Sequence, residues 1–308
     1  MPAEILLFQT TDPAKVKRRL LRFREAFLRL GPGFHFALAS YVPGACTEVR
    51  KVVLDGIALD HYVFGPDAID TLAYPYKGAA RPFRLIPGNC DLMAVLARKA
   101  LPDYAQYWVI EDDVEYSGDA HQLFAGLAGR EGDLLATHLA EGFDEWTYSS
   151  MLRSPGGDIT PAQSWLVFLT FFRISGKALD TIDRYYCEGW NGHSENMWAT
   201  ILKHAGMSVV DIGGNGKYVD AQDRGLRYYG EPGERFEKHG SFGTMNIRMW
   251  AGRRKDVLWH PIKPPAAWLR QTRKRWLSVV HYYLERLGLG GAARRSAPSG
   301  KALGNDRS

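Results

Sequence analysis

The sequence predicts an α/β fold in which helices flank a mixed, mostly parallel sheet in a single domain, with a helical tail at the C-terminus. Three observations support this. Short apolar runs alternate with amphipathic stretches over residues 4–212, a pattern typical of parallel strands joined by helices. The 308 residues, 45% of them hydrophobic, suffice to bury a sizeable core. Pro264-Pro265 then separates a body, residues 1–263, from a basic tail.

The first half of the body shows two cycles of strand, helix and strand. The helix of the second cycle places Leu92, Val95 and Leu96 on one face, whereas the strands are short, continuous apolar runs. The helix of the first cycle opens with Asp12-Pro13, a typical helix start. The expected strands are 4–10, 34–40, 61–64 and 107–110, and the expected helices are 12–30 and 90–101.

The second half of the body is less regular. Gly118-Asp119 opens a helix that continues to about Ala128, and Gly206 ends another at 192–204. Residues 141–159 are rich in Gly, Asp, Ser and Trp, which favours a loop over a site. Further strands are expected at 133–137, 165–174 and 208–212, with a helix at 175–186.

Charge is distributed unevenly along the chain. The net charge is +5, but the tail from residue 264 holds nine basic and two acidic residues, so the body carries −2. A slightly acidic body argues against a nucleic-acid binder. The scattered cysteines suggest neither a disulfide framework nor a thiolate metal site; they are Cys46, Cys90 and Cys187. With no apolar run of spanning length and no basic start typical of a signal peptide, we expect a cytoplasmic protein.

The sharpest local feature is the stretch from Tyr107 to Glu115, in which an apolar run ends in the successive carboxylates Glu111, Asp112 and Asp113. Burying such a cluster without a counter-charge would be costly. Ligands of open α/β sheets bind beyond the carboxyl ends of the strands, and Mg²⁺ and Mn²⁺ prefer carboxylate oxygens. The alternative is a solvated acidic turn.

This stretch resembles the acidic DxD motif of GT-A (Rossmann-like) glycosyltransferases, in its Glu-Asp-Asp variant. The resemblance covers residues 1–263, through motif order and sheet pattern, and implies that this body is the catalytic domain. It also implies that Asp113 binds the metal, with Glu111 and Asp112 contacting the metal, its bound water or the donor's ribose and sugar. The implied donor is a nucleotide sugar, with a UDP-sugar favoured.

A second match to the family is Trp259-His260-Pro261-Ile262-Lys263, close to the end of the body. The resemblance implies that His260 completes the metal shell and that Lys263 holds the diphosphate. The alternative is an ordinary half-buried histidine beside a proline turn.

The third match is the polar helix start that contains His193 and Glu195. The resemblance places an acidic residue near the acceptor, so Glu195 is the candidate base in an inverting reaction and His193 the reserve candidate. Alternatively, Glu195 only complements the helix dipole. The resemblance further implies base, ribose and phosphate contacts upstream, from Phe8, Thr10, Arg81, Arg84, Asn89 and Asp91.

The basic tail contains a predicted amphipathic helix at 264–287, followed by a probably structureless stretch at 288–308 of a composition typical of disorder. Apolar residues at helical spacing, among them Trp276 and Tyr283, lie between basic ones, so residues 266–287 suit a membrane surface. Packing on the body is the alternative.

The sequence thus predicts a metal-dependent glycosyltransferase that moves a sugar from a nucleotide-sugar donor to a saccharide or glycolipid hydroxyl. A role in bacterial surface polysaccharide synthesis, possibly on the inner face of the membrane, follows from the family. The alternatives are a nucleotidyltransferase, although Phe8-Gln9-Thr10 is no Gly-rich phosphate loop, a metal-dependent hydrolase, and a non-catalytic carbohydrate- or membrane-binding scaffold.

Overall fold

The structure is a computed structural model that describes residues 3–85, 88–142, 152–230, 240–244, 247–270, 272–273 and 277. The chain divides into two compact units, Met1–Ile262 and Lys263–Ser308. Residues 265–270 of the second unit are helical, whereas most of the helix predicted at 264–287, and all of 288–308, lies outside the described residues. Within the described part of the chain, no helix has both the length and the apolar character to span a bilayer.

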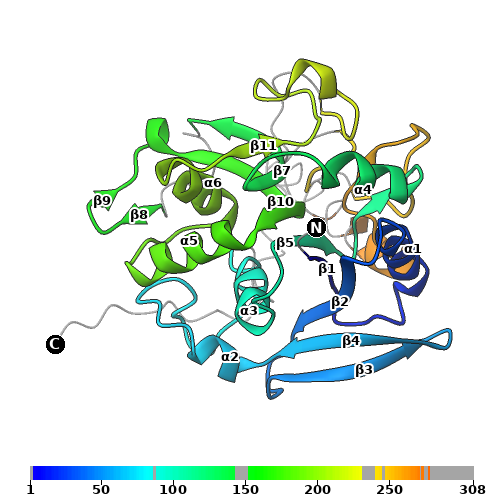
Figure 1. Cartoon of the computed structure of the whole chain (residues 1–308), viewed down its shortest axis with the longest axis horizontal. Coiled ribbons are helices and arrows are strands. Elements are labelled where there is room, and N and C mark those ends of the chain that lie inside the picture. Colours follow the sequence, from blue (N-terminus) through cyan, green and yellow to red (C-terminus); the bar gives the residue numbers. More distant parts are fainter. Residues whose placement is uncertain are drawn as a thin grey trace, which may run out of the picture. The chain divides into compact units, whose positions relative to one another are not determined.

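The main sheet lies in the first unit. Its strands are β1 (Glu4–Gln9), β2 (Phe34–Tyr41), β3 (Glu48–Leu54), β4 (Ile57–Phe64), β5 (Gln106–Glu111), β7 (Leu134–Glu141), β10 (Trp165–Ser175) and β11 (Val209–Asp211). They are ordered β11-β7-β10-β5-β1-β2-β4-β3 (Figure 1). The pairs within β5-β1-β2-β4 and the pair β11-β7 are parallel, whereas β10 and β3 run antiparallel to their neighbours. The fold is therefore the predicted mixed, mostly parallel α/β sheet.

Helices cover both faces of this sheet (Figure 1). Strand β5 shows why: Trp108 and Ile110 point into one apolar core, and Tyr107 and Val109 into the other. The first core is closed by α1 (Lys17–Leu28) and α4 (Ala120–Ala128), and the second by α3 (Leu92–Ala100), α5 (Gly176–Cys187) and α6 (Ser194–His204). The smaller elements are α2 (Pro66–Asp70), β6 (Glu115–Tyr116), β8 (Arg153–Ser154), β9 (Gly157–Asp158), β12 (Leu258–Trp259) and 3-10 turns at Pro161–Gln163 and Ala221–Asp223.

Side-chain caps explain where some helices begin. Asp119 accepts a hydrogen bond from the His121 amide at 2.9 Å at the start of α4, and Ser175 accepts one from Ala178 at 3.1 Å at the start of α5. Both starts are close to the predicted ones. The helix expected from Asp12 begins only at Lys17, and Val16 at its N-cap provides no side-chain hydrogen bond.

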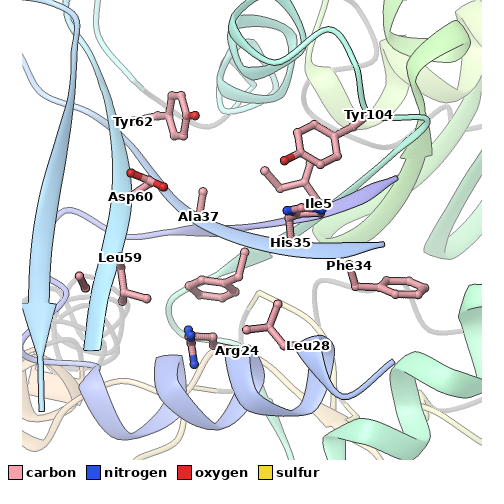
Figure 2. Close-up of a pocket in the computed structure, with 12 residues that line it drawn as sticks. Ile5, Arg24, Leu28, Phe34, His35, Ala37, Leu59, Asp60, Tyr62 and Tyr104 are labelled. Carbon is pink, nitrogen blue, oxygen red and sulfur yellow. The ribbon is translucent and has the colours of Figure 1, made fainter. Parts of the chain in front are cut away.

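One pocket lies at the amino ends of the parallel strands (Figure 2). Strands β2 and β4 pair only from Leu38↔His61 to Tyr41↔Phe64, although both begin four residues earlier. The pocket of about 200 Å³ lies around these strand starts, with Arg24 and Leu28 of α1 on one side and Tyr62 on the other. It is thus at the end of the sheet opposite to the carboxyl end of β5, where the acidic residues lie.

Candidate functional site

The acidic cluster sits where β5 leaves the sheet. Strand β5 ends at Glu111, and the chain turns at once, with the Val114 amide donating to the Glu111 carbonyl at 3.1 Å. Val114 is fully buried and anchors the turn, and Asp113 is only 5% exposed, whereas Glu111 and Asp112 are half-buried. The cluster therefore lies at the carboxyl end of a central parallel strand, the usual ligand position in open α/β sheets.

A two-residue ladder brings the end of the body to this turn. Strand β6 pairs antiparallel with β12, so that Glu115 lies opposite Trp259. The next contact along the chain is the Ile262 amide, which donates to the Asp113 carbonyl at 2.8 Å. His260 lies between these two connections and is therefore held beside Asp113.

The ring of His260 has one nitrogen committed and one facing the carboxylates. Its Nδ1 lies 2.7 Å from the Gly243 carbonyl, and since a carbonyl can only accept, Nδ1 carries the proton. The other nitrogen, Nε2, lies 3.3 Å from Asp113 Oδ1 and 3.9 Å from Glu111 Oε2. One ligand atom from each of these three residues lies within 4.8 Å of the others. In the neutral ring, Nε2 and the carboxylate oxygens are all acceptors, so the arrangement calls for a cation between them.

The charge around the turn agrees with a divalent cation. Glu115 is engaged by two guanidiniums of α1: Arg19 Nε lies 3.0 Å from one carboxylate oxygen, and Arg22 contacts the other. Arg19 also donates to the carbonyl of Asp112. Four carboxylates then face two guanidiniums, which leaves two negative charges for a bound ion to neutralise.

His260 itself responds to this surplus. Its side chain is 8% exposed, and burial disfavours the charged ring, but the carboxylates of Asp113 and Glu111 outweigh that effect and raise the pKa of His260 above its ordinary value. Without a metal, a proton on Nε2 would supply the positive charge that the carboxylates require.

The helix start that contains Glu195 lies near the same cluster. Burial, followed by the charges of Glu111, Asp91 and Glu195, raises the pKa of Cys90 to about 12. Glu111 and Glu195 therefore both lie within Coulombic reach of one thiol. The Glu195 side chain is 13% exposed, and its Oε2 lies 3.7 Å from His193 Nδ1.

His193 caps α6 through its ring. Its Nδ1 accepts the Glu195 amide hydrogen at 3.4 Å. Burial, together with the positive charge of Lys77, lowers the pKa of His193 to about 4. The ring is thus neutral near pH 7, with an unprotonated Nδ1 that is already used as the cap.

No family model and no curated protein matches the sequence. Among solved structures, an active-site mutant of LgtC, a GT-A glycosyltransferase, is similar over 68% of this chain and 72% of its own, with 10% sequence identity and a TM-score of 0.37. A 4-diphosphocytidyl-2C-methyl-D-erythritol synthase from Anaerococcus prevotii is similar over 68% of this chain and 86% of its own, with 11% identity and a TM-score of 0.36. These similarities are too distant to indicate a shared reaction.

The other residues singled out in the sequence are more dispersed. Phe8 is fully buried in the core that α1 closes, 6.4 Å from the ring of Phe23, so its side chain does not offer a surface for a base. Arg81 is held by Asp70 at 2.8 Å, Arg84 is exposed and Asn89 is half-buried beside the start of α3. Lys263 is the first residue of the second unit. Its contact with a diphosphate stays a prediction.

Asp91 lies in the interior. It is 4% exposed, with Lys77 beside Oδ1, while Oδ2 accepts hydrogen bonds from Tyr186 at 2.6 Å and Trp198 at 3.0 Å. These partners engage both carboxylate oxygens, so Asp91 is placed to support the fold beneath the site.

Sequence reasoning missed several residues that shape the site. Arg19 and Arg22 share one face of α1, and their spacing of three residues was a usable signal. Gly243 and His138 gave none, because both act through tertiary contacts. The segment of Gly243 lies beside His260 through a bridge between Phe242 and His260. The ring of His138 lies 6.0 Å from that of Phe168, which in turn packs on His260.

Thr10 connects the end of β1 to the acidic turn, and its replacement should destabilise the fold. Thr10 is 4% exposed and its Oγ1 donates to Asp112 Oδ2 at 2.8 Å. Thr10→Val keeps the shape but removes the donor, so we expect the free energy of unfolding in urea to fall by about 1–2 kcal/mol. The exposed neighbour variant Thr11→Val should change it by less than about 0.5 kcal/mol. Equal effects of the two would contradict this role.

Two buried histidines should make the fold sensitive to acid. Burial lowers the pKa of His61 to about 4, as it does for His193. Below pH 6.5 the unfolded chain takes up protons at these residues while the folded chain does not, so stability falls as pH decreases from about 6.5 towards 4, by roughly 2–3 kcal/mol per histidine. In urea titrations at several pH values, His61→Gln should show a shallower loss than wild type. The exposed His35→Gln variant should keep the wild-type slope, and an unchanged slope in His61→Gln would refute the assignment.

Proposed function

We propose that the protein is a metal-dependent glycosyltransferase that transfers a sugar from a nucleotide-sugar donor to a hydroxyl acceptor. The observation that carries the proposal is the orientation of His260, whose Nε2 faces Asp113 at 3.3 Å and Glu111 at 3.9 Å while Nδ1 is committed to Gly243. This trio lies at the carboxyl end of β5, next to the half-buried Asp112.

The ligand set favours Mn²⁺ over Mg²⁺. Mg²⁺ prefers oxygen ligands alone, whereas one imidazole and two carboxylates suit a softer ion of the same charge. Glu111, Asp113 and His260 would hold the ion. When bound, it would neutralise the charge that develops on the departing nucleoside diphosphate.

Glu195 is better suited than His193 to take the proton from the acceptor hydroxyl. His193 has a pKa of about 4 and uses its free Nδ1 as a helix cap, so it is a weak base near neutral pH. Glu195 keeps a partly exposed carboxylate near the metal cluster. In this role it would act as general base in an inverting transfer.

The remaining assignments follow from the family resemblance. Asp112, Arg84 and Asn89 are the accessible candidates for donor contacts, and Lys263 is the candidate for the diphosphate. A UDP-sugar is the favoured donor. The acceptor would be a saccharide or glycolipid of a bacterial surface polysaccharide pathway, with residues 266–287 binding the inner membrane face.

The test is nucleoside diphosphate release from a panel of UDP-, GDP- and dTDP-sugars, with Mn²⁺ or with excess chelator. Metal-dependent release from one donor class would support a glycosyltransferase, since slow hydrolysis often occurs without the proper acceptor. Diphosphate release from CTP and a sugar phosphate would instead indicate a nucleotidyltransferase. Folded protein that binds Mn²⁺ but no nucleotide sugar would contradict the proposal and favour a hydrolase or a scaffold.

A further inference from the structure

Lys77 is a charged residue that is almost completely removed from water. Its side chain is 1% exposed, and its Nζ lies 3.2 Å from Oδ1 of Asp91, whose side chain is fully buried. Withdrawing both charges from water is costly, and hydrophobic residues of similar volume often stabilise a fold as well as a buried ion pair does. Stability alone is therefore a poor reason for this pair.

The three N–H donors of Lys77 reach three separate places. One faces Asp91, one donates to the Gly88 carbonyl, and one donates to the Gly192 carbonyl at 3.0 Å. Gly88 precedes α3, and Gly192 precedes α6. A single ammonium thus connects the two chain segments that flank the start of each helix.

The same two segments also contact each other directly. The Ser194 amide donates to the Gly88 carbonyl at 3.2 Å. A Cβ atom on Gly88 would lie 2.7 Å from Cδ2 of His193, and Gly88 has a positive φ of 95°. The loop therefore lies against the residue that caps α6, and any shift of the loop would move His193 and Glu195.

We propose that Lys77 is a positioning residue that locks the first turn of α6 to the loop before α3 and so fixes Glu195 relative to the Glu111–Asp113–His260 cluster. The inference rests on the proposed function, because it gives Glu195 a partner in the reaction. Lys77 itself touches no substrate. Its charge is matched by Asp91, and its hydrogen bonds hold two carbonyls that no helix or strand satisfies.

The test is the double variant Lys77→Met/Asp91→Asn, which removes both charges together and avoids a buried unpaired ion. We expect amide hydrogen exchange at residues 194–197 to rise at least tenfold. With UDP-sugars and Mn²⁺, kcat should fall at least tenfold, while the donor KM and the Mn²⁺ dissociation constant stay within threefold of wild type. If the double variant does not fold, Lys77→Gln, which keeps an amide donor, is measured in the same way.

The matched control is Arg98→Met/Asp180→Asn, which removes an ion pair of 2.8 Å that joins α3 to α5 away from the site. Exchange and kcat in this control should stay near wild type. The inference is overturned if the Lys77 variant shows the exchange and kcat of the control, or if its kcat falls only in proportion to a loss of folded protein. If wild type turns over no nucleotide sugar, the proposed function fails, and the exchange at residues 194–197 still decides whether Lys77 holds this turn.

Discussion

Asp113→Asn should reduce the affinity for Mn²⁺ by roughly 100-fold or more and bring donor turnover down to the level seen with chelator. Asp113 is the most buried carboxylate of the acidic turn, and its Oδ1 faces His260 at 3.3 Å. Asparagine keeps the size but removes the charge and one anionic ligand. Calorimetric titration with Mn²⁺ and the nucleotide release assay measure the two effects.

The neighbouring variant Asp112→Asn is the control for Asp113. Its amide oxygen can still accept the hydrogen bond of Thr10, and its side chain is not part of the metal-binding trio. We expect its affinity for Mn²⁺ to stay within about tenfold of wild type. If the two variants lose metal binding equally, the effect is one of total charge and the assignment of Asp113 as ligand is wrong.

Glu195→Gln should lower kcat by a factor on the order of 100 to 10,000, the usual contribution of a general base. Glutamine retains the shape of the side chain and still leaves its backbone amide to the His193 cap. Because Glu195 is not a member of the metal-binding trio, Mn²⁺ affinity and donor KM should remain close to wild type. Steady-state kinetics of donor turnover, with water or a saccharide as acceptor, separates kcat from KM.

Glu188→Gln is a suitable comparison for Glu195. Glu188 lies at the end of α5, where it forms an exposed ion pair with Arg184, and its loss should leave kcat unchanged. A Glu195→Gln variant with wild-type kcat would show that this carboxylate is not the base. A retaining mechanism would be one explanation of that result.

The fold was predictable because local patterns and the final packing agree. The strands around Leu6, Leu38 and Trp108 are apolar runs that lie buried between two helical layers, and their bounds differ from the predicted ones by one residue or so. Strand β3 was missed because most of its residues are exposed and charged. Its turn, Asp55-Gly56, has positive φ at both residues and is a common hairpin signal that the analysis of apolar runs passed over.

The site was predictable only in part. An acidic stretch after an apolar strand and a late histidine suggested the trio, and the structure brings their side chains together; the role of each residue stays a prediction. The burial of Phe8 and Asp91 could not be predicted, because it depends on which face of a strand or helix meets the opposite layer. Lys77 had no sequence signal, since a lone lysine in a Gly- and Pro-rich loop is usually solvated.

The short ladder between β6 and β12 has a consequence for the order of folding. The hydrogen bond from Trp259 Nε1 to Ser117 Oγ closes a loop of 142 residues, so this connection forms late compared with the local hairpins and helices. A chain emerging from the ribosome can assemble most of the sheet while its acidic turn still lacks His260. The nascent protein would therefore gain its third metal ligand, and with it any activity, only when synthesis is nearly finished.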